Sequence, residues 1–129
     1  MSVLMCPVCR QALNLVANSW QCEKGHHYDV AKQGYVNLHV VQHKHSKTPG
    51  DTPESVLARR EFLQAGFYQP LQQVMVELLQ QLKPKAVLDI GCGEGYYTHA
   101  MQPWTKHCVG VDIAKTAVQR AAKLNSRVV

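Results

Sequence analysis

Residues 86–95 read Ala-Val-Leu-Asp-Ile-Gly-Cys-Gly-Glu-Gly, and this stretch decides the fold class. Its first five residues are a short apolar run of the kind that forms a buried parallel strand. The glycines that follow adopt φ values that other residues resist, and they let a ligand approach the backbone closely. A strand that passes through a glycine-rich loop into a helix predicts an α/β fold, with a ligand site at the carboxyl end of the strand.

The chain after this loop continues the alternation of helix and strand. The expected elements are a short helix over 96–101 that stops at Pro103, a strand over 108–112, a helix over 114–123 and the opening of a third strand at 127–129. Such alternation is typical of a parallel sheet with right-handed crossovers. A doubly wound fold uses about six strands, so residues 85–129 hold only the N-terminal part of one.

Two helices are predicted before the first strand. Asp51 is the expected N-cap of the first helix, with Pro53 in the first turn and Glu54 completing a capping box, and Gly66 should end it. The second helix, over 70–82, carries an apolar stripe at helical spacing and ends before a proline. The stripe consists of Leu71, Val74, Met75, Leu78, Leu79 and Leu82.

Residues 6–26 have the spacing of metal ligands. Cys6-Pro7-Val8-Cys9 is followed by twelve residues and then by Cys22-Glu23-Lys24-Gly25-His26. Zinc takes four donors in a tetrahedron, and two turns that each present a pair of ligands can build one. Four protein ligands leave no open position, so the ion is expected to be structural. His27 competes with His26 for the fourth place, and spacing alone does not separate them.

Composition limits the remaining possibilities. The chain of 129 residues is 46% hydrophobic and 18% charged, which favours a packed core over disorder. No apolar run approaches the roughly 20 residues needed to span a bilayer, and the first five residues are too short for a signal-peptide core. A cytoplasmic location is therefore expected, where clustered thiols favour metal over disulfides. The net charge of +5 permits contact with nucleic acid without requiring it.

These features predict three parts. Residues 1–38 form a zinc-binding module, 39–84 a basic linker and helical connector, and 85–129 an incomplete α/β domain. The module is expected to consist of small hairpins with β-like runs at 19–22, 27–30 and 35–38. Because so short a segment has little core of its own, metal binding should supply much of its folding free energy.

Two acidic side chains indicate the ligand of the glycine loop. Asp112 ends the second strand, 17 residues after Gly95, where a carboxylate can accept both hydroxyls of a ribose. Asp89 ends the first strand and suits a ligand with a cationic group. S-adenosylmethionine has a ribose, an ammonium and a sulfonium but no pyrophosphate, so it fits this set. The alternatives are an NAD site, disfavoured because the spacing is not GxGxxG, and a strand–helix turn whose two acids cap helices.

Together the two motifs closely resemble the bacterial guanine-N1 methyltransferases of 23S ribosomal RNA. The matching residues, which extend over essentially the whole chain, are Cys6-Pro7-Val8-Cys9, Cys22, His26, 32–38, 42–44, 49–51, 58–60, Phe62-Leu63, 68–71 and 87–98. Members of that family look like a zinc domain joined to a class I, Rossmann-like methyltransferase domain. The resemblance implies the same α/β fold here, with the second domain truncated.

The resemblance also implies residue roles. By similarity the zinc ligands are Cys6, Cys9, Cys22 and His26. Tyr68, Gly93 and Glu94 match positions that contact the cofactor, although Tyr68 fits the role of a core tyrosine equally well. With the residues of the loop and the two acids, the expected cofactor-binding set is Tyr68, Asp89, Gly91, Gly93, Glu94, Gly95 and Asp112.

The implied reaction is methyl transfer to N1 of a guanine in a ribosomal RNA hairpin. N1 lies on the Watson–Crick edge, so the base must be unpaired or extruded to be reached. Lys44 and Lys47 either bind RNA phosphates or belong to a solvated basic linker, and Arg59 and Arg60 either contact RNA or are ordinary exposed helix charges. Cys92 is interpreted as a small packing residue, and the catalytic base is unknown because its region is not in this sequence. A homodimer of the full-length protein and a non-catalytic, zinc-stabilised RNA-binding module are further hypotheses.

Overall fold

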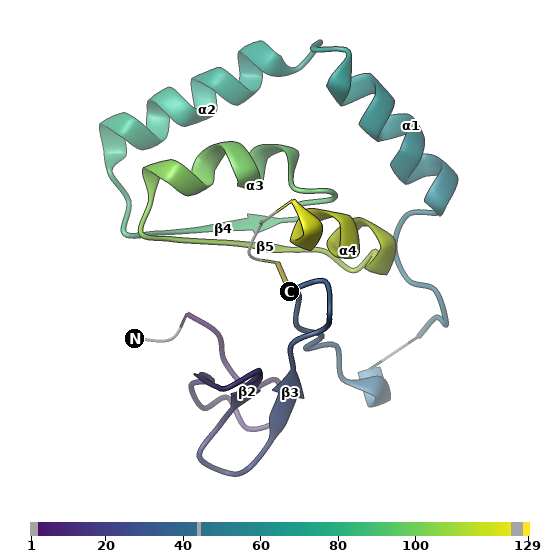
Figure 1. Cartoon of the computed structure of the whole chain (residues 1–129), viewed down its shortest axis with the longest axis vertical. Coiled ribbons are helices and arrows are strands. Elements are labelled where there is room, and N and C mark those ends of the chain that lie inside the picture. Colours follow the sequence, from purple (N-terminus) through teal and green to yellow (C-terminus); the bar gives the residue numbers. More distant parts are fainter. Residues whose placement is uncertain (1–2, 44, 125–127) are drawn as a thin grey trace.

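The structure, a computed structural model, describes residues 3–43, 45–124 and 128–129. A small β module lies below two long helices and a parallel sheet with helices against it (Figure 1). The elements are β1 (Asn14–Val16), β2 (Ser19–Gln21), β3 (His27–Asp29), η1 (Val41–His43), α1 (Pro53–Gln64), α2 (Gln69–Leu82), β4 (Ala86–Ile90), α3 (Tyr96–Met101), η2 (Gln102–Trp104), β5 (His107–Val111) and α4 (Lys115–Lys123).

The N-terminal module is an antiparallel sheet in the order β1-β2-β3. Trp20 of β2 lies opposite Leu15 on one side and Tyr28 on the other. The prediction of hairpins is confirmed for β2 and β3, but β1 was not expected, and residues 35–38 contribute a single bridge through Val36. The sequence did not predict β1 because the turn that joins it to β2 carries no glycine. Ala17 in this turn adopts a φ of 54°, which is uncommon for a residue other than glycine.

The first connector helix begins one residue later than predicted. Thr52, not Asp51, is the N-cap of α1, and its hydroxyl accepts a hydrogen bond from the backbone N–H of Ser55 at 3.2 Å. Asp51 instead forms an exposed ion pair with Arg59, with 3.0 Å between the charged atoms. The capping box of Asp51 and Glu54 is therefore wrong, because the neighbouring hydroxyl takes the capping position.

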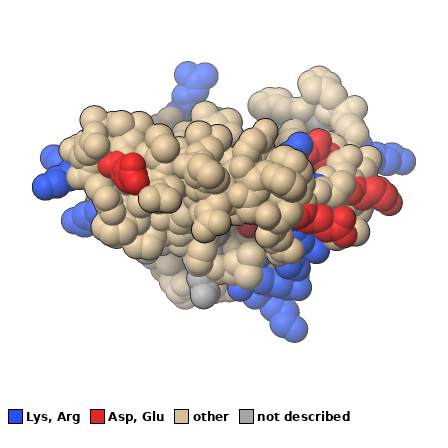
Figure 2. All heavy atoms as spheres, turned by 90° about the horizontal axis from the view of Figure 1, so that it is seen from above, with Lys and Arg blue, Asp and Glu red and all other residues tan. Residues whose placement is uncertain are grey.

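Only part of the apolar stripe of α2 is buried against the rest of the chain. Leu79 is buried and packs with Met101 and Cys108, and Met75 lies partly buried beside them. The other stripe residues, each about half exposed or more, are Leu71, Val74, Leu78 and Leu82. Seen from above, the molecule has a broad uncharged face with charges gathered toward its margins (Figure 2). The periodicity thus predicted the helix correctly, while only part of its apolar face is covered within this chain.

The sheet is parallel, as predicted. β4 pairs with β5 in a register that runs from Ala86 opposite His107 to Ile90 opposite Val111. On the other side of β5, Val128 forms a parallel bridge with Gly110, so the described end of the chain begins a third strand. Arg127, the first residue of the predicted strand, lies outside the described residues. The α/β fold class is confirmed.

The α/β part has several small clusters of buried side chains. One joins α4 to the loop and the third strand and consists of Cys92, Val118, Ala121, Ala122 and Val128. Tyr35, from the end of the zinc module, packs against this cluster. Among the described residues, no helix combines the length and the apolar character that crossing a bilayer requires.

Candidate functional site

Two tight turns present the four candidate metal ligands. In the first turn the backbone N–H of Arg10 donates to the carbonyl of Cys6 at 2.8 Å. In the second, the N–H of Cys22 donates to the carbonyl of His26 at 3.0 Å, and the N–H of Gly25 donates back to the carbonyl of Cys22. Each turn therefore holds two ligand side chains on the same side of the backbone, as the spacing of the motif predicted.

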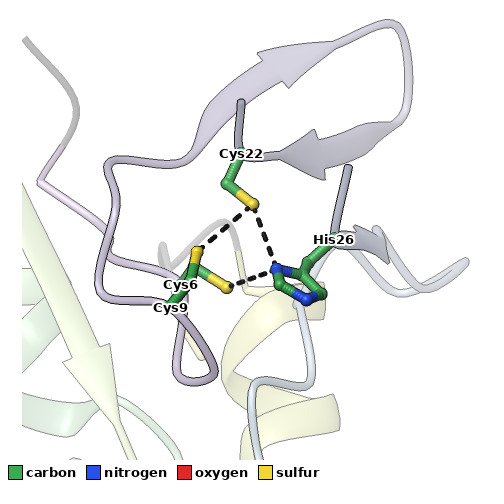
Figure 3. Close-up of side chains that lie close together, drawn as sticks. All are labelled: Cys6, Cys9, Cys22 and His26. Atoms are coloured by element: carbon green, nitrogen blue, oxygen red, sulfur yellow. Dashed lines mark hydrogen bonds between the residues drawn. The ribbon is translucent and has the colours of Figure 1, made fainter. Parts of the chain in front are cut away.

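The four ligand atoms form a compact cluster (Figure 3). Nδ1 of His26 lies 3.4 Å from the Sγ of Cys22 and 3.6 Å from that of Cys6, and the Sγ atoms of Cys9 and Cys22 are 3.6 Å apart. All four atoms lie within 4.8 Å of one another. A zinc tetrahedron with bonds of about 2.0–2.3 Å has edges of roughly 3.5–3.8 Å, so the donor set fits Zn²⁺.

The position of His27 decides between the two histidines. His27 is exposed, and its Nδ1 lies 3.4 Å from the carbonyl of Gly25, away from the thiols. His26 is the histidine that joins the three cysteines. Spacing left both candidates open because the two histidines are adjacent, and the turn before β3 brings His26 to the thiols while His27, the first residue of β3, is exposed.

Tyr28 supports the cluster from β3. Its hydroxyl lies 3.3 Å from the Sγ of Cys6. Burial by itself raises the pKa of the Cys6 thiol, but hydrogen bonds from Tyr28 and from the backbone of Cys9 and Val8 outweigh it and lower that pKa to about 6. Burial and the bond to Cys6 raise the pKa of Tyr28 to about 12, so the phenol remains a donor. Sequence reasoning missed Tyr28, which lies in β3 two residues after His26.

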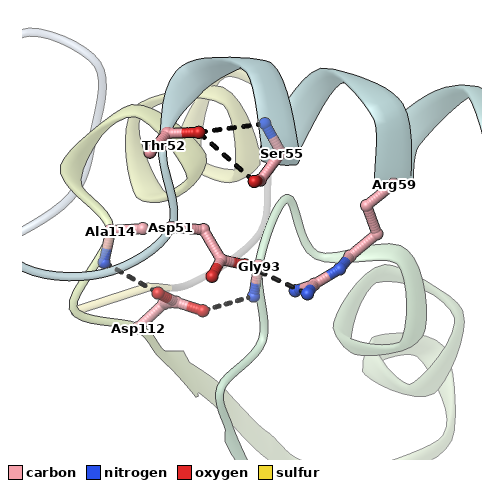
Figure 4. Close-up of polar contacts among 7 residues, drawn as sticks. All are labelled: Asp51, Thr52, Ser55, Arg59, Gly93, Asp112 and Ala114. Carbon is pink, nitrogen blue, oxygen red and sulfur yellow. Dashed lines mark hydrogen bonds and ion pairs between the residues drawn. The ribbon is translucent and has the colours of Figure 1, made fainter.

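The glycine loop is tied to the second strand. The backbone N–H of Gly93, a residue with φ of 56°, donates to Oδ2 of Asp112 at 2.8 Å, and the N–H of Ala114 donates to Oδ1 at 2.7 Å (Figure 4). Each carboxylate oxygen has two lone pairs, so each keeps acceptor capacity for a ligand hydroxyl. Asp112 therefore shapes the loop and remains able to bind a ribose.

Asp89 and Gly95 form hydrogen bonds within the protein, and neither residue lines the two cavities described below. Oδ2 of Asp89 accepts a hydrogen bond of 2.6 Å from the hydroxyl of Thr98, which is fully buried in α3. Gly95 is the N-cap of α3, and its N–H donates to the carbonyl of Cys92. Thr98, which sequence reasoning missed, thus connects the first strand to the helix after the loop.

Two cavities meet at the carboxyl ends of the strands. The smaller, of about 390 Å³, lies between α1, the loop and α4, and from the expected cofactor set it is lined by Tyr68, Gly91, Gly93, Glu94 and Asp112. The larger, of about 1020 Å³, is lined by residues 35–39, 47–53 and 111–113 among others. Both include Asp51, Arg59, Gly91 and Asp112. Their volumes lie in the range of small-molecule sites.

The linker forms one wall of the larger cavity because Gly50 allows a close approach. Gly50 has φ of 92°, and a Cβ at this position would lie 2.8 Å from the backbone of Ala114. A larger residue would push the linker away from the start of α4. Lys47 lines the same cavity, whereas Lys44 lies outside the described residues.

Glu94 is held by two arginines. Arg60 of α1 makes two hydrogen bonds to its carboxylate, one of them 2.7 Å from Nε to Oε2. Nε of Arg120 on α4 forms an ion pair with the same oxygen at 3.2 Å. The side chain of Glu94 is only 14% exposed. Arg59, in its exposed ion pair with Asp51, agrees with the interpretation of an ordinary exposed helix charge, whereas the partly buried pairing of Arg60 with Glu94 was not included in either interpretation from the sequence.

Cys92 packs inside the loop. Burial and the charges of Asp112 and Asp89 raise the pKa of its thiol to about 12. A Cβ on Gly110 would lie 2.8 Å from the sulfur, so the thiol fills the space that this glycine leaves. These observations agree with the interpretation of Cys92 as a small packing residue.

Two family models match the chain. The model described as "RlmA, N-terminal" matches residues 4–47, and one described as "Methyltransferase domain" matches residues 81–128. The first match contains the metal cluster, and the second contains the glycine loop and Asp112. The chain thus combines a zinc ribbon with a methyltransferase domain, which implies S-adenosylmethionine as the cofactor and agrees with structural zinc.

Similar proteins carry matching names. The chain is 35% identical over 130 residues to the "23S rRNA (guanine(748)-N(1))-methyltransferase" of Streptomyces fradiae, covering 96% of this chain and 45% of that protein. It is 33% identical over 146 residues to the "Putative 23S rRNA (guanine-N(1)-)-methyltransferase" of Micromonospora griseorubida, covering 96% and 48%. The chain spans about half the length of these curated relatives. Over 96% of its length the chain is therefore similar to proteins named 23S rRNA (guanine-N1)-methyltransferases, and its two parts match a zinc ribbon and a methyltransferase domain.

Proposed function

We propose that the chain is the zinc-ribbon and cofactor-binding portion of an enzyme that transfers a methyl group from S-adenosylmethionine to N1 of a guanine in a hairpin loop of 23S ribosomal RNA. The observation that carries this proposal is the meeting of two cavities at Gly91 and Asp112, at the carboxyl edge of a parallel sheet. Open α/β sheets bind ligands at that edge. The names of the similar proteins supply the substrate.

The proposed cofactor site follows from these contacts. Asp112 accepts the ribose hydroxyls, and Gly91 and Gly93 let the ligand lie against the backbone. Tyr68 and Glu94 line the smaller cavity, while Asp89 and Gly95 contribute by fixing the loop and α3. S-adenosylmethionine supplies an electrophilic methyl group on its sulfonium. The residues of this chain bind and orient the ligand, and the group that removes the N1 proton is not assigned.

We further propose the division into a zinc module at 1–38, a connector at 39–84 and part of the catalytic domain at 85–129. In the module, Cys6, Cys9, Cys22 and His26 hold a structural zinc. Four protein donors leave no open coordination position for chemistry. The module and the basic linker, which includes Lys47, contact RNA phosphates near the larger cavity.

The remaining parts of the proposal concern the full-length protein. Action on ribosomal RNA supports a cytoplasmic location. The half-exposed apolar stripe of α2 is a surface compatible with the homodimer expected of the longer protein. Because the target nitrogen lies on the Watson–Crick edge, the guanine must leave its pairing partner before it can react.

Calorimetric titration of the zinc-loaded chain with S-adenosylmethionine and, separately, with NAD tests the cofactor assignment. We expect binding of S-adenosylmethionine at one site and no heat from NAD. Binding of NAD without S-adenosylmethionine would overturn the proposal. A second assay, with labelled methyl donor and undermodified 23S ribosomal RNA, compares the chain with a full-length relative. Transfer by the relative alone, with RNA binding by both, would assign this portion to binding without catalysis.

A further inference from the structure

The cluster around Glu94 has an unequal number of charges. One carboxylate, on Glu94, faces two guanidinium groups, on Arg60 and Arg120, at the wall of the smaller cavity. All three side chains line that cavity. The cluster therefore carries a net charge of +1 beside a space large enough for a small ligand.

The two arginines are not equivalent. Arg60 makes two hydrogen bonds to Glu94 in a fork, the geometry that binds a carboxylate most strongly. Arg120 has only the ion pair, and its buried Nε lacks a hydrogen-bonding partner among the described residues. Its side chain is 42% exposed, so the other nitrogens of the guanidinium remain accessible. Arg120 is thus the cation whose donors are least satisfied.

The other acids that line the cavity, Asp51 and Asp112, have their described contacts with groups other than Arg120. Asp51 forms its ion pair with Arg59, and Asp112 accepts hydrogen bonds from the backbone of Gly93 and Ala114. Within the described part of the chain, Arg120 shares the carboxylate of Glu94 with Arg60 and forms no other ion pair. A second carboxylate, supplied by a ligand, would complete the cluster.

We propose that Arg120 binds the carboxylate of the methionine part of S-adenosylmethionine. This inference rests on the proposed function. It adds the residue that recognises the amino-acid end of the ligand. The position is suitable because Gly93 contacts the ribose-binding Asp112 and the next residue, Glu94, contacts Arg120. The carboxylate site and the ribose site are therefore joined through two consecutive residues of the loop.

The test compares S-adenosylmethionine with decarboxylated S-adenosylmethionine, which keeps the adenosine, sulfonium and ammonium groups. By calorimetry we expect the zinc-loaded chain to bind the complete ligand roughly tenfold more tightly or better, the range of one charge-assisted hydrogen-bond contact. Arg120→Gln should remove this preference by weakening only the complete ligand. Arg120→Lys, which keeps the charge but not the fork, should retain an intermediate preference.

Lys123→Gln is the matched control, because Lys123 is a basic residue near the end of the same helix and does not line the cavity. It should leave both affinities unchanged. If the unaltered chain binds both ligands equally, or if Arg120→Gln weakens both equally, the role of Arg120 is overturned while the proposed cofactor stands. If the unaltered chain binds neither ligand, the proposed function itself fails, and this inference fails with it.

Discussion

The zinc module and the α/β part differ in what lies at their centres. In the module the buried cluster consists of Cys6, Leu13 and Cys22, so two of its three members are candidate metal ligands. In the α/β part the buried clusters consist mostly of aliphatic side chains contributed by α2, α4 and the strands. The first region therefore depends on metal–ligand bonds, and the second depends on the burial of apolar surface.

This difference affects how completely each region is covered. A metal site with four ligands is complete once two turns supply them, and it needs no other element packed against it. An apolar stripe or sheet face needs other elements against it, and Leu88 and Ile90 of β4 are mostly exposed, as is much of the stripe of α2. The module thus has its centre complete within this chain, while the α/β part exposes surface that its fold class normally buries.

Removal of zinc is the strongest test of the comparison. Structural zinc contributes roughly 10–16 kcal/mol in small metal-binding peptides, more than so small a core can replace. A chelator should therefore unfold the module and leave the helices. The chain has two tryptophans, Trp20 against the module's cluster and Trp104 in η2, so Trp104→Phe and Trp20→Phe variants report on each region separately. A chelator that shifts neither emission spectrum would show that zinc is not the centre of the module.

His26→Ala and His27→Ala form a matched pair for the same centre. We expect His26→Ala to lower zinc affinity by several orders of magnitude, because one of four donors is lost. His27→Ala should leave the affinity within about twofold, since this exposed side chain lies outside the metal cluster and its Nδ1 is 3.4 Å from the carbonyl of Gly25. Competition with a chromogenic chelator measures both values. Equal losses would mean that the two histidines exchange as ligands.

Loss of the charge on Glu94 should affect only the α/β part. Glu94→Gln leaves Arg60 and Arg120 without a carboxylate, and we expect a loss of roughly 2–3 kcal/mol because the pair is largely buried. Urea unfolding of the Trp20→Phe background, followed through Trp104, measures this loss. Glu77→Gln on the exposed side of α2 is the control and should cost less than about 0.5 kcal/mol. An unchanged midpoint for Glu94→Gln would contradict the role of the cluster in stability.

The two regions also differ in how far the sequence predicted them. The three cysteine ligands were predicted from their spacing, which matches two tight turns, whereas His26 was preferred to His27 only through the resemblance to a known family. In the α/β part, β4, β5 and α4 were predicted to within one residue, since β4 is Ala86–Ile90, β5 is His107–Val111 and α4 is Lys115–Lys123. Apolar runs and nearby turn residues are local signals, and they locate elements well.

The contacts of the cofactor region were not predictable in the same way. Arg60 and Glu94 are 34 residues apart, and neither carries a local signal that names its partner. The pairing of Asp89 with Thr98 depends on how α3 lies against β4. Asp51 was placed as a cap because several residue types cap helices equally well, and the choice of Thr52 depends on the backbone before α1. Tertiary packing, absent from any short window of sequence, determines each of these contacts.

Asp112→Ala tests the link between the loop and the second strand. The N–H groups of Gly93 and Ala114 would lose their acceptor, so we expect a loss of about 1–2 kcal/mol in the α/β part. The affinity for S-adenosylmethionine should fall by roughly tenfold or more, because charged hydrogen bonds to the ribose are lost as well. Calorimetry and urea unfolding separate the two effects. Unchanged affinity would remove Asp112 from the ribose site even if stability falls.

The smallest effect concerns the connector, and it tests to which region α1 belongs. Val56 of α1 packs with Ala114, the N-cap of α4, and with Ala117 of α4, so α1 should unfold with the α/β part. Thr52→Ala removes the side-chain cap and should cost about 1 kcal/mol, whereas Asp51→Ala breaks only an exposed ion pair and should cost less than about 0.5 kcal/mol. The loss for Thr52→Ala should appear in urea unfolding followed through Trp104 and not through Trp20. A shift seen through Trp20 instead would assign the connector to the zinc module, and a larger effect of Asp51→Ala would restore that residue as the cap.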